Sequence, residues 1–253
     1  TFPISFLVAI LGSILEPLIF KLYKKIPFMT VSQSTKKDLE QLGIQEKNIF
    51  IIHNGVNIPK QIKAEKESNK TLIFLVVLSK DKGIERAIEL FSLVNKKING
   101  MQFWIVGKAE KQLLQKIKTQ VSEFGLKDKV KFFGYVDEKK KFELLKRAHL
   151  LINTSIREGW GLVVIEAAAM GTPTIAFDVP GLIDSILNDK TGIIDKQNSI
   201  NSMTSEVINL LSDSNRYQSM RAEAAKWSKR FSWNKAVIKS LDLVNKIMTG
   251  ANS

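Results

Sequence analysis

The chain has 253 residues, of which 44% are hydrophobic, enough to bury the core of one large domain or two small ones and to exclude a disordered chain. Lys and Arg number 38 and Asp and Glu 25, so the formal charge is +13, which favours partners that carry phosphate: nucleic acid, nucleotide or anionic lipid. The absence of cysteine excludes disulfides and thiolate metal sites and is compatible with a reducing cytoplasm, and the two histidines, His53 and His149, are too few and too far apart for a zinc site or a His-based triad.

The first segment with a clear character is an uncharged run of fourteen residues, Phe2 to Leu15. It is shorter than the roughly 20 apolar residues that a membrane-spanning helix requires. No basic segment precedes it and no small-residue cleavage site follows it, which disfavours a signal peptide. We expect a helix that faces a core, with an interfacial membrane helix as the alternative.

A short α/β unit and a linker are expected next. The stretches FMTVSQSTKKDLEQLGI and NIFIIHNGV predict a strand, a helix and a strand, with Ser34 as the candidate N-cap of the helix and Gly43 as its stop. The following stretch, NIPKQIKAEKESNK, is polar and has neither helical nor strand periodicity, so it is interpreted as a linker.

From Thr71 onward, apolar runs alternate with amphipathic segments. The expected strands are TLIFLVVL, MQFWIVG, KVKFFG, HLLINTS and PTIAFD, and the expected helices between them are IERAIELFSLVNKKI, KQLLQKIKTQVSEFG, EKKKFELLKRA and LVVIEAAAM. This order predicts a parallel sheet with helices on both faces and ligands at the carboxyl ends of its strands. After Ser199 the pattern is helical to about Met248, with Trp227, Phe231 and Trp233 as expected packing residues.

One stretch, REGWGLVVIEAAAMGTP, is more than a connection between two elements. Gly159 and Gly161 remove side chains where the backbone turns into the helix. The backbone amides of Gly161, Leu162 and Val163 would form the positive end of that helix, where a phosphate group fits.

The two carboxylates in this stretch can address one ligand from a loop and from a helix. Glu166, as a bidentate acceptor, suits two vicinal hydroxyls such as those of a ribose, and Glu158 suits the hydroxyls of an attached sugar. Carboxylates beside a diphosphate require a nearby cation, and Lys82, in the loop after the first strand of the sheet, is placed to supply it.

The stretch REGWGLVVIEAAAMGTPTIAFDVPGLIDSI resembles the retaining nucleotide-sugar glycosyltransferases of family 4, whose GT-B fold pairs two Rossmann-like domains across a cleft. The hallmark of that family is Glu, seven residues, Glu, which Glu158 and Glu166 match. The resemblance extends in the same order to SQSTKKDLEQLG, IIHNGVN, DKGIERAIELF, FWIVG, VKFFGYV and LINTSIREGWG, and so covers nearly the whole chain from about Met29.

The resemblance implies a role for each matching residue. Glu158, which contacts the transferred sugar, and Lys82, which neutralises the diphosphate, are expected to be catalytic. The expected donor-binding set is Glu166 on the ribose, the backbone around Gly161, Leu162 and Val163 at the diphosphate, and Gly134, Tyr135 and Val136 at the base. Gly159 and Trp160 of the same motif also belong to the donor-binding set. The reaction needs neither metal nor cofactor, because the helix amides and the lysine stabilise the departing nucleoside diphosphate as the sugar becomes oxocarbenium-like.

Two departures from the family pattern bear on function. Family members carry an Arg five residues before the lysine of the Lys-Gly pair, and here that position is Val77, with Lys80 as a possible substitute. The amino-terminal domain of the family carries the acceptor site, and only its last portion, roughly Thr1 to Val56, is expected here.

The sequence therefore predicts an α/β protein with a Rossmann-like parallel sheet and a partial second Rossmann-like domain. The expected divisions are an acceptor-domain remnant (1–56), a linker (57–68), a donor-binding domain (69–212) and carboxy-terminal helices (213–253). The expected function is transfer of a hexose, with retention, from a nucleotide diphosphate sugar to a hydroxyl acceptor, lipid-linked or part of a growing glycan. The alternative is a non-catalytic nucleotide- or sugar-binding remnant of such an enzyme.

The positive charge leaves the choice of partner surface open. No nucleic-acid motif accompanies the scattered lysines, so nucleic acid is not expected to be a partner. A cytoplasmic protein that associates peripherally with the anionic inner face of the cell membrane is expected, and a charge without any membrane role is the alternative.

Overall fold

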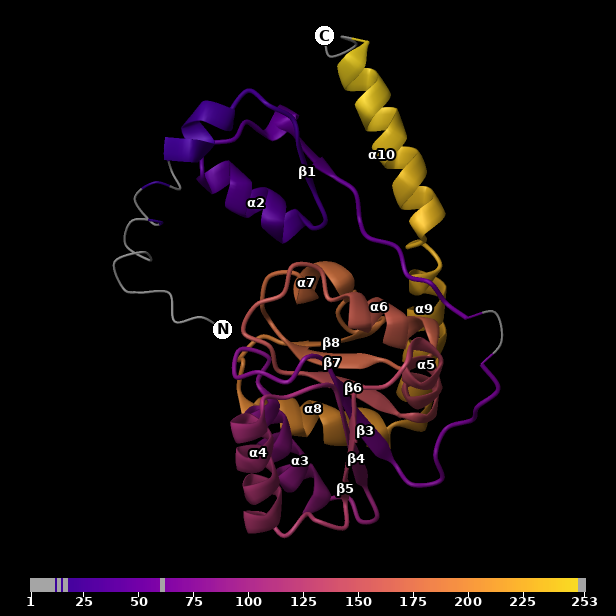
Figure 1. Cartoon of the computed structure of the whole chain (residues 1–253). Helices are drawn as coiled ribbons and strands as arrows, with labels where there is room; N and C mark the ends of the chain where they lie inside the picture. Colours follow the sequence, from indigo (N-terminus) through magenta and orange to yellow (C-terminus); the bar gives the residue numbers. More distant parts are fainter. Residues whose placement is uncertain (1–11, 13–14, 16–17, 60–61, 250–253) are drawn as a thin grey trace.

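A computed structural model describes residues 12, 15, 18–59 and 62–249 of the chain (Figure 1). Most of the expected helix over Phe2 to Leu15 lies outside these residues. The described part contains a six-stranded sheet, a separate two-stranded sheet near the amino terminus and a group of carboxy-terminal helices. This arrangement confirms the predicted α/β class.

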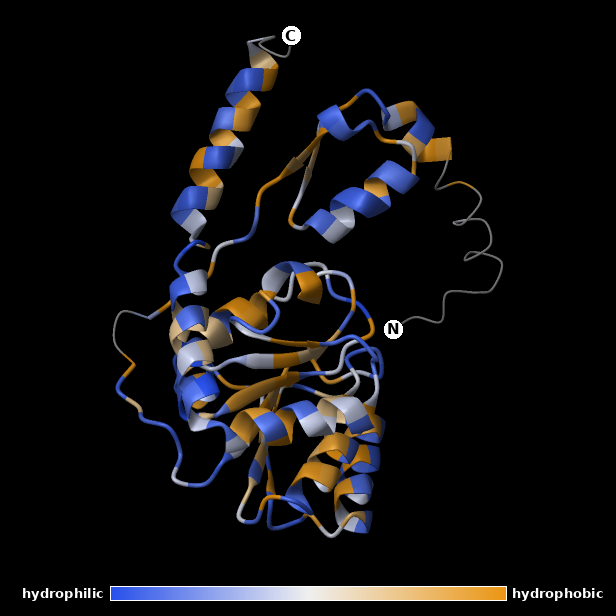
Figure 2. Ribbon diagram, turned by 180° about the vertical axis from the view of Figure 1, so that it is seen from behind, coloured by the Kyte–Doolittle hydropathy of each residue, from blue (hydrophilic) through white to orange (hydrophobic). Residues whose placement is uncertain are grey.

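The large sheet is parallel throughout, with strand order β5-β4-β3-β6-β7-β8. Its strands are β3 (Thr71–Leu75), β4 (Gln102–Val106), β5 (Val130–Gly134), β6 (Leu150–Asn153), β7 (Thr174–Phe177) and β8 (Gly192–Asp195). The strands are mostly apolar along their whole length because helices cover both of their faces, and Figure 2 shows this hydrophobic centre.

The helices form two layers around the sheet. One layer contains α4 (Lys111–Glu123), α3 (Ile84–Asn95) and α8 (Ile200–Ser212), and the other contains α5 (Glu138–Arg147), α6 (Leu162–Ala169) and α9 (Ser214–Ser228). The short helix α7 (Leu182–Ser185) contacts α6. The first five strands and four intervening helices of this sheet were predicted, whereas α7 and β8 were not.

The amino-terminal unit contains β1 (Phe28–Thr30), α2 (Gln33–Gln41), the 3-10 turn Glu46–Asn48 and β2 (Ile49–Ile51), with β1 and β2 paired in parallel. The N-cap of α2 is Ser32, whose hydroxyl accepts a hydrogen bond from the Thr35 amide. The prediction of Ser34 as the N-cap is therefore wrong by two residues. Ser34 instead contacts the large sheet's unit: its amide donates to Asp184 Oδ2 (3.0 Å) and its hydroxyl accepts from the Gly181 amide (3.3 Å).

The last helix, α10 (Trp233–Met248), leaves the large sheet and lies beside the amino-terminal unit (Figure 1). Residues of β2 and α10 line a common cavity of about 410 Å³. Figure 2 shows hydrophobic and hydrophilic residues interleaved along α10. Among the described residues, none of the helices is both long enough and apolar enough to cross a membrane.

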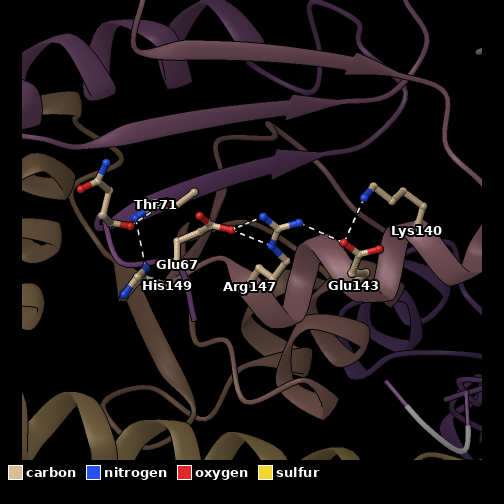
Figure 3. Close-up of polar contacts among 7 residues, drawn as sticks. Glu67, Thr71, Lys140, Glu143, Arg147 and His149 are labelled. Carbon is tan, nitrogen blue, oxygen red and sulfur yellow. Dashed lines mark hydrogen bonds and ion pairs between the residues drawn. The ribbon is translucent and has the colours of Figure 1, made fainter. Parts of the chain in front are cut away.

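The segment between the two units has no helix or strand over residues 52–59 and 62–70, and side-chain contacts hold it against α5. Arg147 forms an ion pair with Glu67 (Figure 3). Lys66 donates to the Ala148 carbonyl and to Thr172 Oγ1 (2.6 Å). Burial, assisted by nearby Arg221, lowers the pKa of Lys66 to about 7. The predicted domain boundaries are not decided by these contacts and stay predictions.

Gly83 joins the loop after β3 to α3 at a point where a side chain does not fit. Its φ is +74°, and a Cβ would lie 2.2 Å from the Thr154 carbonyl oxygen at the end of β6. Gly125 has a similar φ of +66° but no atom within 4 Å of the Cβ position. The two glycines therefore separate the cost of a left-handed backbone from the cost of a clash.

We expect Gly125→Ala to lower the free energy of unfolding by about 1–2 kcal/mol, the cost of a left-handed L-residue. Gly83→Ala should cost about 1–3 kcal/mol more, because the loop must also move away from β6. Chemical denaturation of both variants measures the difference. Equal losses would contradict the close approach of Gly83 to Thr154.

Candidate functional site

A cavity of about 430 Å³ lies at the carboxyl ends of β3 and β6. The loop after β3 supplies Lys82, the loop after β6 supplies Glu158, and the second turn of α6 supplies Glu166. The remaining lining residues are Val31, Asn54, Leu75, Val76, Lys141, Gly159, Trp160, Gly161, Leu162 and Val163. The structure thus brings Lys82 and both glutamates of the sequence motif to one cavity.

Glycines shape the loop that enters α6. Gly161, the N-cap, has a φ of +73°, and a Cβ there would lie 3.1–3.3 Å from Leu182, Ser185 and Val164. A Cβ on Gly181 would lie 2.3 Å from the Glu158 carbonyl oxygen, so a second loop packs directly on the backbone of the motif. The amides of Leu162 and Val163, in the first turn of α6, have no acceptor within the helix and lie at the wall of the cavity, where an anion can bind.

Each glutamate of the cavity has a lysine partner. Lys82 Nζ lies 2.9 Å from Glu158 Oε1, which also accepts a hydrogen bond from Ser155 Oγ (3.0 Å). Lys141 Nζ lies 2.6 Å from Glu166 Oε1. The two carboxylates therefore sit in the cavity without net negative charge, as a site for a diphosphate requires.

Burial raises the pKa of Glu166, and the hydrogen bond from Lys141 only partly offsets this. Burial also acts to lower the pKa of Lys141, but its hydrogen bonds to Glu138 and Glu166 outweigh burial and raise it. Sequence motifs did not mark Lys141. A usable signal existed, because α5 follows β5 and its first turns must start at the carboxyl edge of the sheet.

The residues expected at a nucleotide base lie beside a second cavity, of about 310 Å³, at the ends of β4 and β5. Gly134 and Tyr135 line it, and Lys108 Nζ lies 4.8 Å from the centre of the Tyr135 ring. Val136 is not among its lining residues and packs against the hydrophobic core instead. The cavity is therefore built around two of the three expected residues.

Val77 lies beyond the end of β3, with 71% of its surface exposed. Together with Lys80 and Lys108 it lines a separate hollow of about 590 Å³. Lys80 is thus outside the set that lines the cavity of the two glutamates, and the hypothesis that it replaces the family arginine has no support from this geometry. An arginine at position 77 would start from an exposed loop, not from a buried strand.

The two histidines serve packing and backbone contacts. The His53 ring stacks on Trp160 with centroids 4.4 Å apart, and its Nδ1 lies 2.7 Å from the Val31 carbonyl oxygen. His149 Nδ1 accepts from the Thr71 amide (3.1 Å; Figure 3), and burial, with nearby Lys66, lowers its pKa to about 4. Both contacts are structural, and neither histidine lines the cavity of the two glutamates.

The fold and the cavity together define the class of GT-B glycosyltransferases, in which ligands bind where the order of a parallel sheet reverses. The chain belongs to the glycosyl transferases group 1 family, which it matches over residues 56–227. It is 32% identical over 179 residues to a Staphylococcus aureus poly(ribitol-phosphate) alpha-N-acetylglucosaminyltransferase, covering 69% of this chain and 34% of the relative. It is 26% identical over 204 residues to a Mycobacterium tuberculosis glycogen synthase, covering 78% and 48%.

Solved structures agree with this family. S. aureus TarM, in a mutant bound to fondaparinux, alpha-GlcNAc-glycerol and UDP, superposes with a TM-score of 0.79 at 27% identity, covering 91% of this chain and 46% of TarM. Anabaena HepE, bound to UDP and glucose, superposes with a TM-score of 0.76 at 19% identity, covering 92% and 66%, which shows a shared fold. The chain spans about a third to a half of the length of the first curated relatives it matches.

Trp160 is only 3% exposed, although it belongs to the glutamate motif. Its ring packs between His53 and Phe231 (centroids 5.2 Å apart) and joins a small hydrophobic cluster with Val56 and Ile165. The cluster ties the motif loop to Val56, just before the linker, and to Phe231, in the connection between α9 and α10. Packing of the indole is therefore the contribution that the geometry assigns to this side chain.

We expect Trp160→Ala to lower the free energy of unfolding by about 3–5 kcal/mol, because a buried aromatic side chain leaves a cavity. Trp160→Phe keeps most of the apolar contact and should cost clearly less. Urea unfolding of both variants provides the measurement. A Trp160→Ala variant as stable as the wild type would show that the indole is not a structural element.

Proposed function

We propose that this chain binds a nucleotide diphosphate sugar in the 430 Å³ cavity and belongs to an enzyme that transfers the sugar to a hydroxyl group with retention of configuration. The observation that carries the proposal is the placement of Glu158 and Glu166, each paired with a lysine, around the amino terminus of α6. UDP in the TarM structure supports the choice of a nucleoside diphosphate.

Each wall of the cavity has a part in the proposed reaction. The amides of Gly161, Leu162 and Val163 and the ammonium of Lys82 bind the diphosphate, Glu166 accepts from the ribose hydroxyls, and Glu158 accepts from the sugar. Gly159, and Gly134 and Tyr135 beside the second cavity, complete the donor site. Lys82 is shared, because a bound diphosphate competes with Glu158 for its charge.

The bond between the anomeric carbon and the diphosphate oxygen breaks first in this proposal, and positive charge develops on the sugar. The amides and Lys82 stabilise the negative charge that builds up on the leaving diphosphate, so the scheme does not require a metal ion. The acceptor oxygen then bonds to the anomeric carbon on the face that the diphosphate left, and the acceptor proton passes to the departing phosphate oxygen. Configuration is retained without a protein nucleophile.

The acceptor is proposed to be a hydroxyl on a phosphate-rich or lipid-linked glycan. Two relatives are named for transfer to poly(ribitol-phosphate) and poly(glycerol-phosphate), and a formal charge of +13 suits such polyanions. We place the reaction on the cytoplasmic side of the membrane, in keeping with a chain free of cysteine. A longer chain that also contains a complete acceptor domain and still transfers no sugar would favour the alternative, a non-catalytic binding remnant.

Titration with UDP, ADP and GDP tests the donor site directly. Glu166→Ala should weaken the tightest of the three by up to roughly 1.5–3 kcal/mol for each hydrogen bond to the ribose that is lost. Calorimetry measures the affinity, with Glu143→Ala, on the side of α5 that contacts the linker, as the control. Wild-type affinity in Glu166→Ala would remove Glu166 from the site.

Substitution of Val77 tests whether the loop after β3 faces the diphosphate. We expect Val77→Arg to tighten nucleoside diphosphate binding by roughly 1–3 kcal/mol, in a salt-dependent manner, and to leave nucleoside binding almost unchanged. Because Val77 is exposed, the melting temperature should change little. An intact melt without any gain in diphosphate affinity would mean that this loop does not reach the phosphates.

A further inference from the structure

Of the described charged residues that line the 430 Å³ cavity, only Lys141 was not marked by a sequence motif. The side chains of Lys141 and Glu166 are both only 15% exposed, and their contact distance is 2.6 Å. We propose that Lys141 is a positioning residue of the donor site, which holds Glu166 as an oriented carboxylate that accepts both ribose hydroxyls. The inference rests on the proposed donor site and adds a residue to it.

The geometry allows Lys141 and a ribose to share Glu166. The ion pair uses Glu166 Oε1, and an ionised carboxylate offers about four lone-pair positions on its two oxygens. Glu166 is fixed by its place in the second turn of α6, and Lys141 approaches from α5, which packs on α6. The Lys141 ammonium therefore fixes the orientation of the Glu166 carboxylate and leaves acceptor positions open for the ribose hydroxyls.

A second set of contacts fixes α5 itself. On the side toward the linker, Lys140 Nζ and Arg147 Nη1 both lie 3.0 Å from Glu143 Oε1, and Arg147 reaches Glu67 (Figure 3). Lys140 and Lys141 thus have equal charge and adjacent positions but different partners. Lys140 is a matched control for the loss of one positive charge from this helix.

The groups that face Glu166 determine how its affinity for a ribose changes with pH. From α5 these are Lys141 and Glu138, and from the loops they are Lys82 and Glu158, which pair with each other. Burial and Glu138 raise the pKa of Glu166, and Lys141 opposes them. Without Lys141 that pKa rises further. Because the carboxylate is the form that accepts two hydroxyls, binding would then be lost at a higher pH as the solution is acidified.

The test titrates the tightest of UDP, ADP and GDP, and its 2′,3′-dideoxy analogue, from mildly acidic to mildly alkaline pH. Lys141→Met should weaken the normal nucleotide by roughly tenfold, equivalent to one charge-assisted hydrogen bond, and move the acid side of its binding profile to higher pH. The dideoxy analogue, which lacks the ribose hydroxyls but has the same phosphates, should be unaffected. Lys141→Arg and Lys140→Met should behave like the wild type.

Lys141→Met could instead weaken the binding of the normal and the dideoxy nucleotide equally, without moving the acid side of the binding profile. That result would place Lys141 on the diphosphate and overturn the proposal. If Lys141→Met binds the nucleotide as the wild type does while Glu166→Ala binds it more weakly, the inference is overturned and the proposed function is left intact. A wild-type chain that binds none of the three nucleotides would defeat the proposed function itself. If melting shows that Lys141→Met does not fold, Lys141→Gln, which still donates to Glu166, replaces it with the same pH shift expected.

Discussion

The reversal of strand order between β3 and β6 is the constraint on which the rest of the molecule depends. Chain connections run from β3 outward to β4 and β5, and then return across the sheet to β6, β7 and β8. Right-handed crossovers put the helices of the two halves on opposite faces, so a crevice opens between the loops after β3 and β6. Lys82 and Glu158 lie in those two loops, and the absence of a side chain on Gly83 lets the loops approach.

The partial removal of Glu158 and Glu166 from water then determines which ligands this crevice can bind. Two half-buried carboxylates would each be costly without a partner, and each has a lysine that restores local neutrality. A ligand that brings its own negative charge can exchange with these ion pairs at a modest electrostatic cost. A neutral sugar alone would leave the pairs intact and gain little from them.

Much of the large sheet could be predicted from sequence because the apolar residues of its strands and of its helices follow different spacings. Most of these segments are long enough for the two spacings to be told apart. The strand β8 could not, since it has four residues, begins with Gly192 and ends with the charged Asp195. Glu158, Glu166 and Lys82 were found because the motif is local in sequence. Lys141 and Asn54 were missed because neither belongs to a motif that is local in sequence. The position of α5 after β5 could have placed Lys141 at the carboxyl edge of the sheet, whereas only tertiary packing brings Asn54, which follows β2, to the cavity. The cap at Ser32 was missed because Ser32 and Ser34 are chemically alike, and the start of the helix decides between them.

The backbone passes between the amino-terminal unit and the large sheet's unit twice, and the two passages touch. The Val56 amide donates to the Phe231 carbonyl, and a Cβ on Gly55 would lie 2.0 Å from the Trp233 nitrogen. A rotation of one unit against the other would therefore act on both passages where they touch. The two backbone segments form a hinge point at this crossing, and the absence of a side chain at Gly55 allows them to lie in direct contact.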